Sequence, residues 1–366
     1  EIIVNGDFKS CAAISTISDF KLFTFLSDVL SLYTFFNVID QNILRKFEEK
    51  TGIPVHVKHF DSNTGMRAQL EINGGSGYDI IAPSDYMVEI LAESGFLQPI
   101  DTRKIKNYTD IDGRLLGREH DPENKYCVPV AWTIYGVGFN KEWLSGLKEP
   151  DSWTALFEPN KFWTGKEWEA KSKDYKICMY DEPTDVVFAA SFYLYGNVSK
   201  FSAERLSGIK KLLLQQRYLV GSYGETNLPY YISGVCPVVM ATSANMGRLM
   251  SVSPNFGFKI PKEGSIITIE TLAITKDSKN VDLAHQFIDF AISEESSRAS
   301  FNEYEYFPSN KKAYSEIDSE LRADTSFFPD DKAFLRLHSE LYRNISIEEI
   351  NNLWIDVKSR KIEPRP

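Results

Sequence analysis

Several motifs of catalysis are missing from this sequence of 366 residues. It contains no GxxxxGKS/T phosphate loop, no GxSxG nucleophile elbow and no HExxH zinc motif, and its GGSG at 74–77 precedes a predicted strand instead of following one. His56 and His59 alternate along IPVHVKHF, which indicates a strand and not a metal-ligand cluster. These absences argue against nucleotide chemistry, serine hydrolysis and metal binding, and we expect no cofactor.

Cysteine is scarce, with 4 residues in the whole chain. Cys11, Cys127, Cys178 and Cys236 are widely spaced and include no CxxC pair, so they do not form the dense disulfide framework of a small secreted domain. This spacing leaves the redox compartment open. Cys11 lies in FKSCAAIS, where a preceding lysine and the lack of an upstream apolar run argue against a lipid-attachment site.

Basic residues are fewer than acidic ones: the chain has 41 Lys and Arg and 51 Asp and Glu, which gives a net charge of -10. This balance argues against a nucleic-acid partner and is compatible with attraction of a cation. It is equally typical of a solvated acidic surface. With 43% hydrophobic and 25% charged residues, the chain is long enough for two ordinary globular domains.

The sequence has no clear membrane span. Residues 22–39, LFTFLSDVLSLYTFFNVI, contain Asp28 and are only just long enough to cross a bilayer. We predict a helix with the spacing of Leu22, Phe25 and Leu26, followed by a buried strand from Leu30, and the alternative is a leftover membrane anchor. The chain begins with Glu, so a signal can have been removed, and residues 1–28 form an extension of unknown role.

From Leu30 onwards, short apolar β-runs alternate with helical patterns such as QNILRKFEEKTG and DYMVEILAESG. This order predicts an α/β fold with mixed sheets and helices on both faces. Gly52 and Gly95 stand where these two helices need a glycine after their last turn. Ligands of such sheets sit beyond the carboxyl ends of the strands, which here are residues 35–38 and 83–86.

Two long apolar β-runs, VPVAWTIYGVGFN and SIITIETLAIT, are expected to cross between two lobes. No Gly/Ser linker separates the lobes, so crossing strands favour a hinge around an interlobe cleft. The predicted lobes are residues 29–137 plus 268–311, and residues 138–267 plus 312–366.

Acidic residues occur at one predicted strand end and inside one predicted strand. Glu182 and Asp185 lie in MYDEPTDVVF, where a strand ends near Tyr180 and a helix begins. Three interpretations stay open for this pair: helix capping, cation binding, and hydrolysis by paired acids. Glu270 lies within the apolar run ITIETLAIT, where a buried charge costs several kcal/mol unless it is paired, and a ligand ammonium is one candidate partner.

The turn in IIAPSDYMVEI supplies further candidates. Pro83 ends the strand, and Ser84 or Asp85 can cap the following helix. Capping does not explain Tyr86, which is expected either in the cleft wall or in the core.

At these residues the chain resembles the spermidine/putrescine-binding proteins of bacterial ABC transporters, which are two-lobed periplasmic solute-binding proteins. The resemblance runs from about Leu30 to about Asn310 and more weakly to the C-terminus. It is carried by GYDIIAPSDYMVEILAESGFLQPID, FEEKTGIPV, VPVAWTIYGVGFN, PKEGSIITIETLAI and DLAHQFIDFAIS. It implies a monomeric, extracytoplasmic or periplasmic binding protein, with or without a membrane anchor, that is not an enzyme and delivers a small cationic polyamine to a membrane permease.

The same resemblance assigns the ligand-binding residues. Those expected to bind are Phe35, Ser84, Asp85, Tyr86, Glu182, Asp185, Thr242, Asn245, Glu270, and Phe307 or neighbouring Tyr306. In such a site carboxylates bind the ammonium groups, while aromatic faces line the methylene chain. Thr242 and Asn245 stand where many relatives have an aromatic residue and an Asp, and Thr268 stands where they have Trp, so two aromatic walls are missing.

Two other functions remain as alternatives. One is a glycosidase-like hydrolase that uses Glu182 and Asp185, and it would turn over a substrate. The other is a polyamine sensor that docks on a signalling protein, and it would lack a permease partner.

Overall fold

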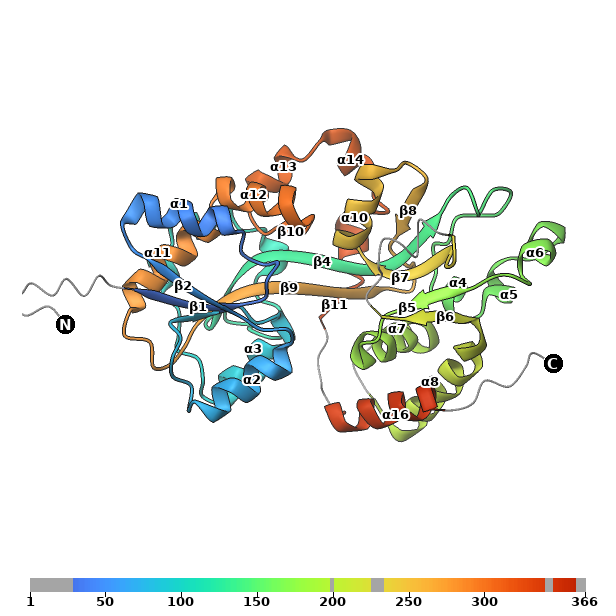
Figure 1. The fold of residues 1–366 in the computed structure, drawn as a ribbon, viewed down its shortest axis with the longest axis horizontal. Helices are drawn as coiled ribbons and strands as arrows, with labels where there is room; N and C mark the ends of the chain where they lie inside the picture. Colours follow the sequence, from blue (N-terminus) through green and yellow to red (C-terminus); the bar gives the residue numbers. More distant parts are fainter. Residues whose placement is uncertain (1–28, 198–200, 225–233, 340–344, 360–366) are drawn as a thin grey trace, which may run out of the picture.

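The computed structural model describes residues 29–197, 201–224, 234–339 and 345–359. The chain forms two lobes joined by two long antiparallel strands, β4 (Cys127–Asn140) and β9 (Ser265–Ile274) (Figure 1). Both strands were predicted from their sequences to cross between the lobes. Among the described helices, none is long and apolar enough to cross a membrane. Most of the helix predicted around residues 22–30 lies outside the described residues.

The first lobe is a mixed sheet in which β1 pairs in parallel with β2 and β3, and β3 pairs antiparallel with β9. Its elements before β4 are β1 (Leu30–Thr34), α1 (Gln41–Thr51), β2 (Val55–His59), α2 (Asn63–Ile72), β3 (Ile80–Ile81), α3 (Asp85–Glu93) and the 3-10 turns η1 (Thr102–Lys104), η2 (Lys106–Asp110) and η3 (Gly113–Leu115). After β9 the chain returns to this lobe as α11 (Val281–Ala291), α12 (Glu294–Tyr304) and β10 (Phe307–Pro308).

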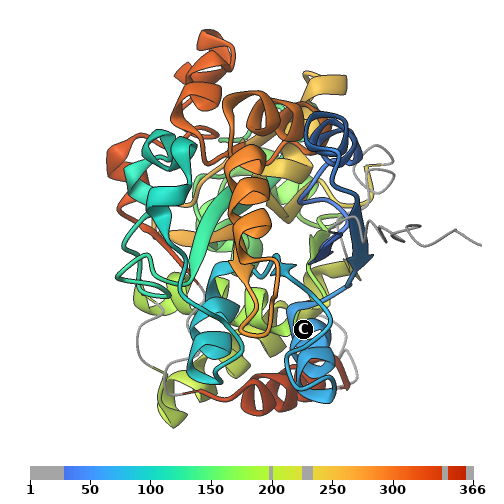
Figure 2. The ribbon, with the colours of Figure 1, turned by 90° about the vertical axis from the view of Figure 1, so that its left-hand side faces the viewer.

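Helices cover both faces of this sheet (Figure 2). Period-two alternation in β1 sends Leu32 into the core beneath α1 and α11, and Tyr33 into the core beneath α2 and α3. The helix α1 begins after Asp40, whose side chain accepts from the Asn42 N–H at 2.8 Å, and ends at Gly52 with φ 72°. Gly52 therefore occupies the left-handed position predicted for it.

The second lobe continues the sheet in the order β4, β7, β5, β6. Its elements are α4 (Thr154–Phe157), α5 (Pro159–Phe162), α6 (Lys166–Lys171), β5 (Ile177–Met179), α7 (Pro183–Tyr195), α8 (Ala203–Gln216), η4 (Arg217–Leu219), β6 (Val220–Tyr223), β7 (Val238–Thr242), α10 (Ser243–Val252) and β8 (Phe256–Lys259). A disulfide joins Cys178 of β5 to Cys236, two residues before β7. The spacing of the cysteines did not predict this pairing, because it depends on the parallel pairing of β5 with β7.

The C-terminal residues pack against both lobes. They form α13 (Lys311–Glu316), α14 (Ser319–Ala323), α15 (Asp331–Phe334), β11 (Leu337–His338) and α16 (Ile347–Ser359). Phe327, Phe328 and Phe334 join Trp132 and Phe307 in a core between the lobes. The strand β11 then pairs in parallel with the start of β9, and α16 packs on α7 and α8 of the second lobe.

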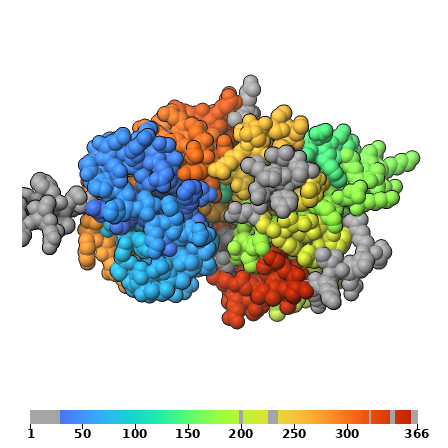
Figure 3. All heavy atoms as spheres, in the orientation of Figure 1, coloured from blue at the N-terminus to red at the C-terminus, as the bar shows by residue number. Residues whose placement is uncertain are grey.

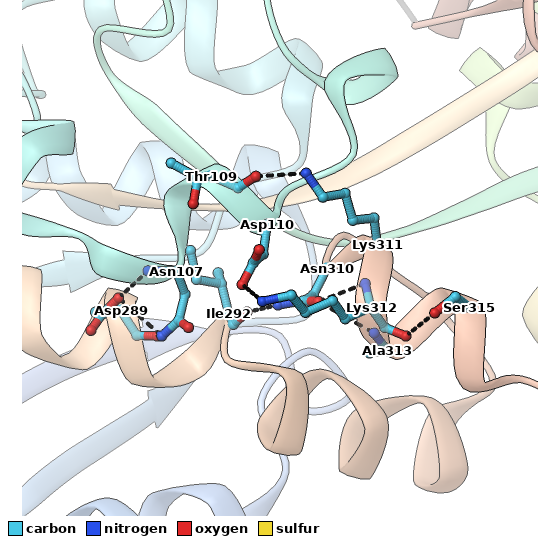
Figure 4. A network of polar contacts seen from close by, with 10 residues as sticks. All are labelled: Asn107, Thr109, Asp110, Asp289, Ile292, Asn310, Lys311, Lys312, Ala313 and Ser315. Carbon is cyan, nitrogen blue, oxygen red and sulfur yellow. Dashed lines mark hydrogen bonds and ion pairs between the residues drawn. The ribbon is translucent and has the colours of Figure 1, made fainter.

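A polar network connects α13 to η2 of the first lobe (Figure 4). Lys312 Nζ donates to Asp110 Oδ2 at 2.7 Å, and Lys311 Nζ donates to the Thr109 carbonyl at 2.8 Å. Asn107 bonds Asp289 of α11 in the same network. These contacts place α13 beside the first lobe. The assignment of residues 312–366 to the second lobe stays a prediction.

Candidate functional site

A cleft of about 320 Å³ lies between the two lobes, where the molecular surface is hollowed (Figure 3). The crossing strands contribute Tyr135, Thr268 and Glu270 to its wall. The other lining residues are Phe35, Asn37, Asp61, Ser62, Asn63, Ser84, Tyr86 and Tyr306 from the first lobe, and Tyr180, Glu182, Thr184, Asp185, Thr242 and Asn245 from the second.

The pleat of β9 aims two of its residues into the cleft. Thr268 and Glu270 line the cavity, while Ile267 and Ile269 point to the opposite face and enter the core between the lobes. An isolated antiparallel bridge between Ser84 and Glu270 brings the start of α3 against this strand. The strand register therefore places a carboxylate beside the first-lobe end of the cleft.

Glu270 is a buried carboxylate that accepts a hydrogen bond from a neutral hydroxyl. It is 6% exposed, and Ser84 Oγ donates to its Oε2 at 3.1 Å. Asn63 fixes that hydroxyl, because Asn63 Nδ2 donates to Ser84 Oγ at 3.0 Å and Asn63 Oδ1 accepts from the Ser84 N–H at 3.1 Å. Within the described ranges, no Lys, Arg or His forms an ion pair with Glu270. Burial raises the pKa of Glu270 to about 8, against the lowering effect of the Ser84 bond and with a further increase from the charge of Asp85.

Asp85, which was expected among the ligand-binding residues, is not one of the residues that line the cleft. It is buried on the far side of the α3 N-terminus, where Ser339 Oγ donates to its Oδ2 and His120 Nδ1 lies 3.8 Å away. Burial lowers the pKa of His120 despite this carboxylate. Successive side chains on a helix diverge by about 100°, so Asp85 points away from the cleft while Tyr86 lines it.

Glu182 and Asp185 line the opposite wall, at the N-terminus of α7. Glu182 occupies the N-cap position and is exposed at the rim, whereas Asp185 is buried in the first turn. The protein atoms around the Glu182 carboxylate raise its pKa by desolvation, hydrogen bonds from Thr184 oppose this shift, and the charge of Asp181 adds to it. Glu182 therefore stands at the N-cap position and Asp185 in the first turn of α7, and both residues line the cleft.

Aromatic side chains from both lobes complete the wall. Tyr135 and Tyr180 meet edge to face, with ring centroids 5.5 Å apart. Asn245 Nδ2 donates to the Tyr180 hydroxyl at 2.9 Å, and Asn37 Nδ2 donates to the Tyr306 hydroxyl at 3.2 Å. Phe35 lines the first-lobe side and packs on Phe60.

Phe307 is also not a lining residue. It is 0% exposed and packs on Trp132 and Phe328 in the core between the lobes. Because β10 pairs Phe307 directly with Trp132, the preceding residue Tyr306 faces the cleft instead. Burial, with smaller contributions from Glu270 and Tyr180, raises the pKa of the Tyr306 hydroxyl well above its ordinary value.

Thr242 and Asn245 lie at the N-terminus of α10, where the Thr242 hydroxyl accepts from the Asn245 N–H at 3.2 Å. Thr242 therefore caps a helix as well as lining the cleft.

Several lining residues were not predicted. Asp61, Ser62 and Asn63 follow β2, so the same strand-end rule that selected residues 35–38 could have found them. Tyr135 lies inside the continuous apolar run of β4, and its sequence setting contains no signal that separates it from the core.

Comparison with known proteins identifies the family. Residues 42–329 match the family described as "Bacterial extracellular solute-binding protein". The putrescine-binding periplasmic protein PotF of Escherichia coli is 26% identical over 349 residues, covering 91% of this chain and 92% of PotF. The spermidine/putrescine-binding periplasmic protein 1 of Haemophilus influenzae is 27% identical over 305 residues, covering 83% of this chain and 81% of that protein.

A solved structure shares the fold. The spermidine/putrescine ABC transporter substrate-binding protein PotD of Streptococcus pneumoniae superposes with a TM-score of 0.77 at 24% identity, covering 91% of this chain and 99% of that chain. The two lobes, the crossing strands and the interlobe cleft thus agree with the family match, and this chain belongs to the bacterial extracellular solute-binding proteins.

Proposed function

We propose that this protein captures a linear polyamine of the putrescine and spermidine class in its interlobe cleft, as the substrate-binding component of an ABC importer. One observation carries the proposal: the lining contains the carboxylates of Asp61, Glu182, Asp185 and Glu270, and no Lys, Arg or His among the described residues. A concave site with several acidic groups and no basic one favours a ligand that brings more than one positive charge.

The arrangement of the carboxylates suits a ligand with charge at both ends. Glu270 stands on the first-lobe side, and Glu182 and Asp185 stand on the second. Each can accept charge-assisted hydrogen bonds from an ammonium group, while the rings of Tyr86, Tyr135 and other aromatic residues contact the methylene chain between the ammonium groups. The names of the relatives, which bind putrescine and spermidine, support the same ligand class.

Capture is expected to close the lobes about β4 and β9. A ligand that contacts both walls binds the closed state better than the open one, and this difference drives the closure. Small-angle scattering with and without putrescine measures it, and an unchanged radius of gyration at saturation would count against a hinged receptor.

The compartment and the partners belong to the same proposal. The disulfide between Cys178 and Cys236 supports a periplasmic or other extracytoplasmic location, since such bonds persist in oxidising compartments. We propose that the protein acts as a monomer and delivers its ligand to a membrane permease.

Calorimetric titration against diamines, triamines and amino acids tests the ligand class directly. We expect saturable binding of a polyamine, and mass spectrometry after long incubation should recover it unchanged. Binding of amino acids but of no polyamine, or recovery of a cleaved product, would overturn the proposal.

A further inference from the structure

Two acidic residues that do not line the cleft are next to residues that do. Asp181 directly precedes Glu182, and Asp85 stands between Ser84 and Tyr86. Both acidic residues are held by side chains of the C-terminal residues that follow α15. One cleft-lining loop in each lobe, residues 84–86 and residues 181–185, is therefore contacted on the side away from the cleft by Ser339 and by α16.

The contact at Asp181 comes from α16. Trp354 Nε1 donates to Asp181 Oδ1 at 3.1 Å, and Lys358 Nζ lies 2.6 Å from Oδ1 and 2.8 Å from Oδ2. The indole is 5% exposed and meets the Tyr223 ring edge to face, with centroids 5.1 Å apart. A packed indole N–H and an ammonium together fix both the position and the orientation of the carboxylate.

The contact at Asp85 comes from the residue after β11. Ser339 Oγ donates to Asp85 Oδ2, and both side chains are buried. Pairing of Leu337 and His338 with β9 fixes the backbone just before Ser339, and Arg118 Nη2 donates to the Leu337 carbonyl at 3.0 Å. The serine therefore reaches Asp85 from a backbone that is held in place.

We propose that these C-terminal residues position the two binding loops from behind: Trp354 and Lys358 hold the loop that carries Glu182, and Ser339 holds the loop that carries Ser84 and Tyr86. This inference rests on the proposed function for its effect on affinity. Hydrogen bonds to a ligand weaken steeply with distance and angle, so a loop that shifts loses affinity although no ligand contact has been deleted.

Two simpler roles give different outcomes. If α16 only stabilises the fold, any substitution that lowers the stability of α16 by the same amount should weaken putrescine binding by the same amount. If Lys358 acts only through its charge, removing it should strengthen the binding of a cation. Lys210 offers a matched control, because it pairs α8 with Asp356 on the same helix and does not contact Asp181.

The test compares Lys358→Met, Asp181→Asn and Lys210→Met by putrescine titration and thermal melting. We expect Lys358→Met and Asp181→Asn each to weaken binding about three- to tenfold, the scale of one or two hydrogen bonds, and Lys210→Met to stay within about twofold of the natural protein. Equal loss in Lys210→Met and Lys358→Met, or tighter binding by Lys358→Met, would overturn the proposal.

The pH dependence of binding separates positioning from loss of stability. The groups that act on the Glu182 carboxylate are the Thr184 donors and the charge of Asp181, which is itself paired with Lys358. Asp185 follows on the same helix, and Arg217 lies over the Tyr223 ring at 5.1 Å. Lys358→Met leaves the Asp181 charge unpaired and should move the acidic limb of the affinity profile to higher pH. Asp181→Asn removes that charge and should move the limb to lower pH. Identical profiles in the two variants would contradict a contact with the Glu182 loop.

Ser339→Ala tests the second contact against Ser315→Ala, which removes an exposed serine hydroxyl that bonds the Lys312 carbonyl. We expect weaker putrescine binding only in Ser339→Ala.

Hydrogen exchange supplies a readout without ligand. Residues 180–185 should exchange faster in Lys358→Met than in Lys210→Met, and residues 84–88 should exchange faster in Ser339→Ala than in Ser315→Ala. If the natural protein binds no polyamine but these exchange differences occur, the proposed function fails and the positioning role stands. If binding occurs and exchange is the same in each variant and its control, the positioning role fails alone.

Discussion

The two walls of the cleft hold their carboxylates in different ways. On the first-lobe side, Glu270 is buried on a strand, bonded to the Ser84 hydroxyl, with a pKa raised to about 8. On the second-lobe side, Glu182 and Asp185 stand at the N-terminus of α7, where the helix dipole and its free N–H groups favour negative charge. Desolvation raises the pKa of Glu182 as well, but the hydrogen bonds from Thr184 oppose that shift. Glu270, with a pKa of about 8, needs the charge of the ligand to become ionised at neutral pH.

Glu270→Gln is expected to have the largest effect on binding, because it replaces the carboxyl of the first wall with a neutral group of the same shape. We expect a loss of about 1.5–3 kcal/mol of putrescine affinity, the scale of a charge-assisted hydrogen bond. The melting temperature without ligand should be unchanged or higher, since Gln resembles the protonated acid. Titration calorimetry and a thermal melt measure both quantities.

The control for this variant is Glu295→Gln, which changes an exposed carboxylate paired with Lys46. It should leave affinity unchanged. Lost stability with unchanged affinity in Glu270→Gln would remove Glu270 from the binding site.

The next largest effect is expected in the pH dependence of binding. Because the pKa of Glu270 is about 8 without ligand, ammonium binding at pH 7 must displace its proton. Affinity should therefore fall as pH falls below about 8, by up to about tenfold per pH unit. Calorimetry at pH 7 in two buffers of different ionisation enthalpy should detect proton release on binding, which Glu270→Gln should abolish.

The same shift has a signature without ligand. The folded protein holds the Glu270 proton more tightly than the unfolded chain, whose ordinary pKa is 4.5, so this contribution to stability is lost as pH rises towards about 8. A difference melt between the natural protein and Glu270→Gln across this range isolates it. No divergence between the two melting curves would contradict the raised pKa.

Glu182→Gln should have a smaller effect than Glu270→Gln, because Glu182 is exposed at the rim and water can replace part of what it gives a ligand. We expect a loss of about 0.5–1.5 kcal/mol of affinity, measured by titration at a pH well above the pKa of Glu270, so that Glu270 is ionised. A loss larger than that of Glu270→Gln would reverse the comparison between the walls.

Thr268→Phe is expected to give the smallest effect, and in the opposite direction. It adds an aromatic face beside Glu270 in the cleft. The family resemblance implies a Trp at this strand position in many relatives. The gain for linear diamines should be about 0.5–1 kcal/mol, the lower range of a cation–π contact. Parallel titrations of putrescine and spermidine measure it, and weaker binding of both would indicate that the cleft needs this space.

Much of this architecture follows from local patterns in the sequence. Alternation of β-runs and amphipathic helices predicts the α/β fold, and strand ends select Phe35, Ser84 and Glu182, which the structure places around one cavity. The sequence could not show which of two neighbouring side chains points into the cleft, and Asp85 and Phe307 are each one residue from a lining position. The phase of α3 turns Asp85 towards Ser339. The pairing of β10 with β4 turns Phe307 into the core.

Contacts between residues far apart in the chain could not be predicted from the sequence either. The bond between Cys178 and Cys236, and the contact of Trp354 with Asp181, join positions that become neighbours only when β5, β7 and α16 assemble. No local period or spacing encodes such contacts.

The central place of β9 has a consequence for how the chain reaches its native state. This strand lies between β3 and β4 in the sheet, yet it is synthesised long after both of them. Neither lobe is a contiguous stretch of chain, so a fragment that stops before Ser265 cannot complete the first sheet. Such non-local pairing slows folding. We therefore expect assembly to wait until nearly the whole polypeptide is available.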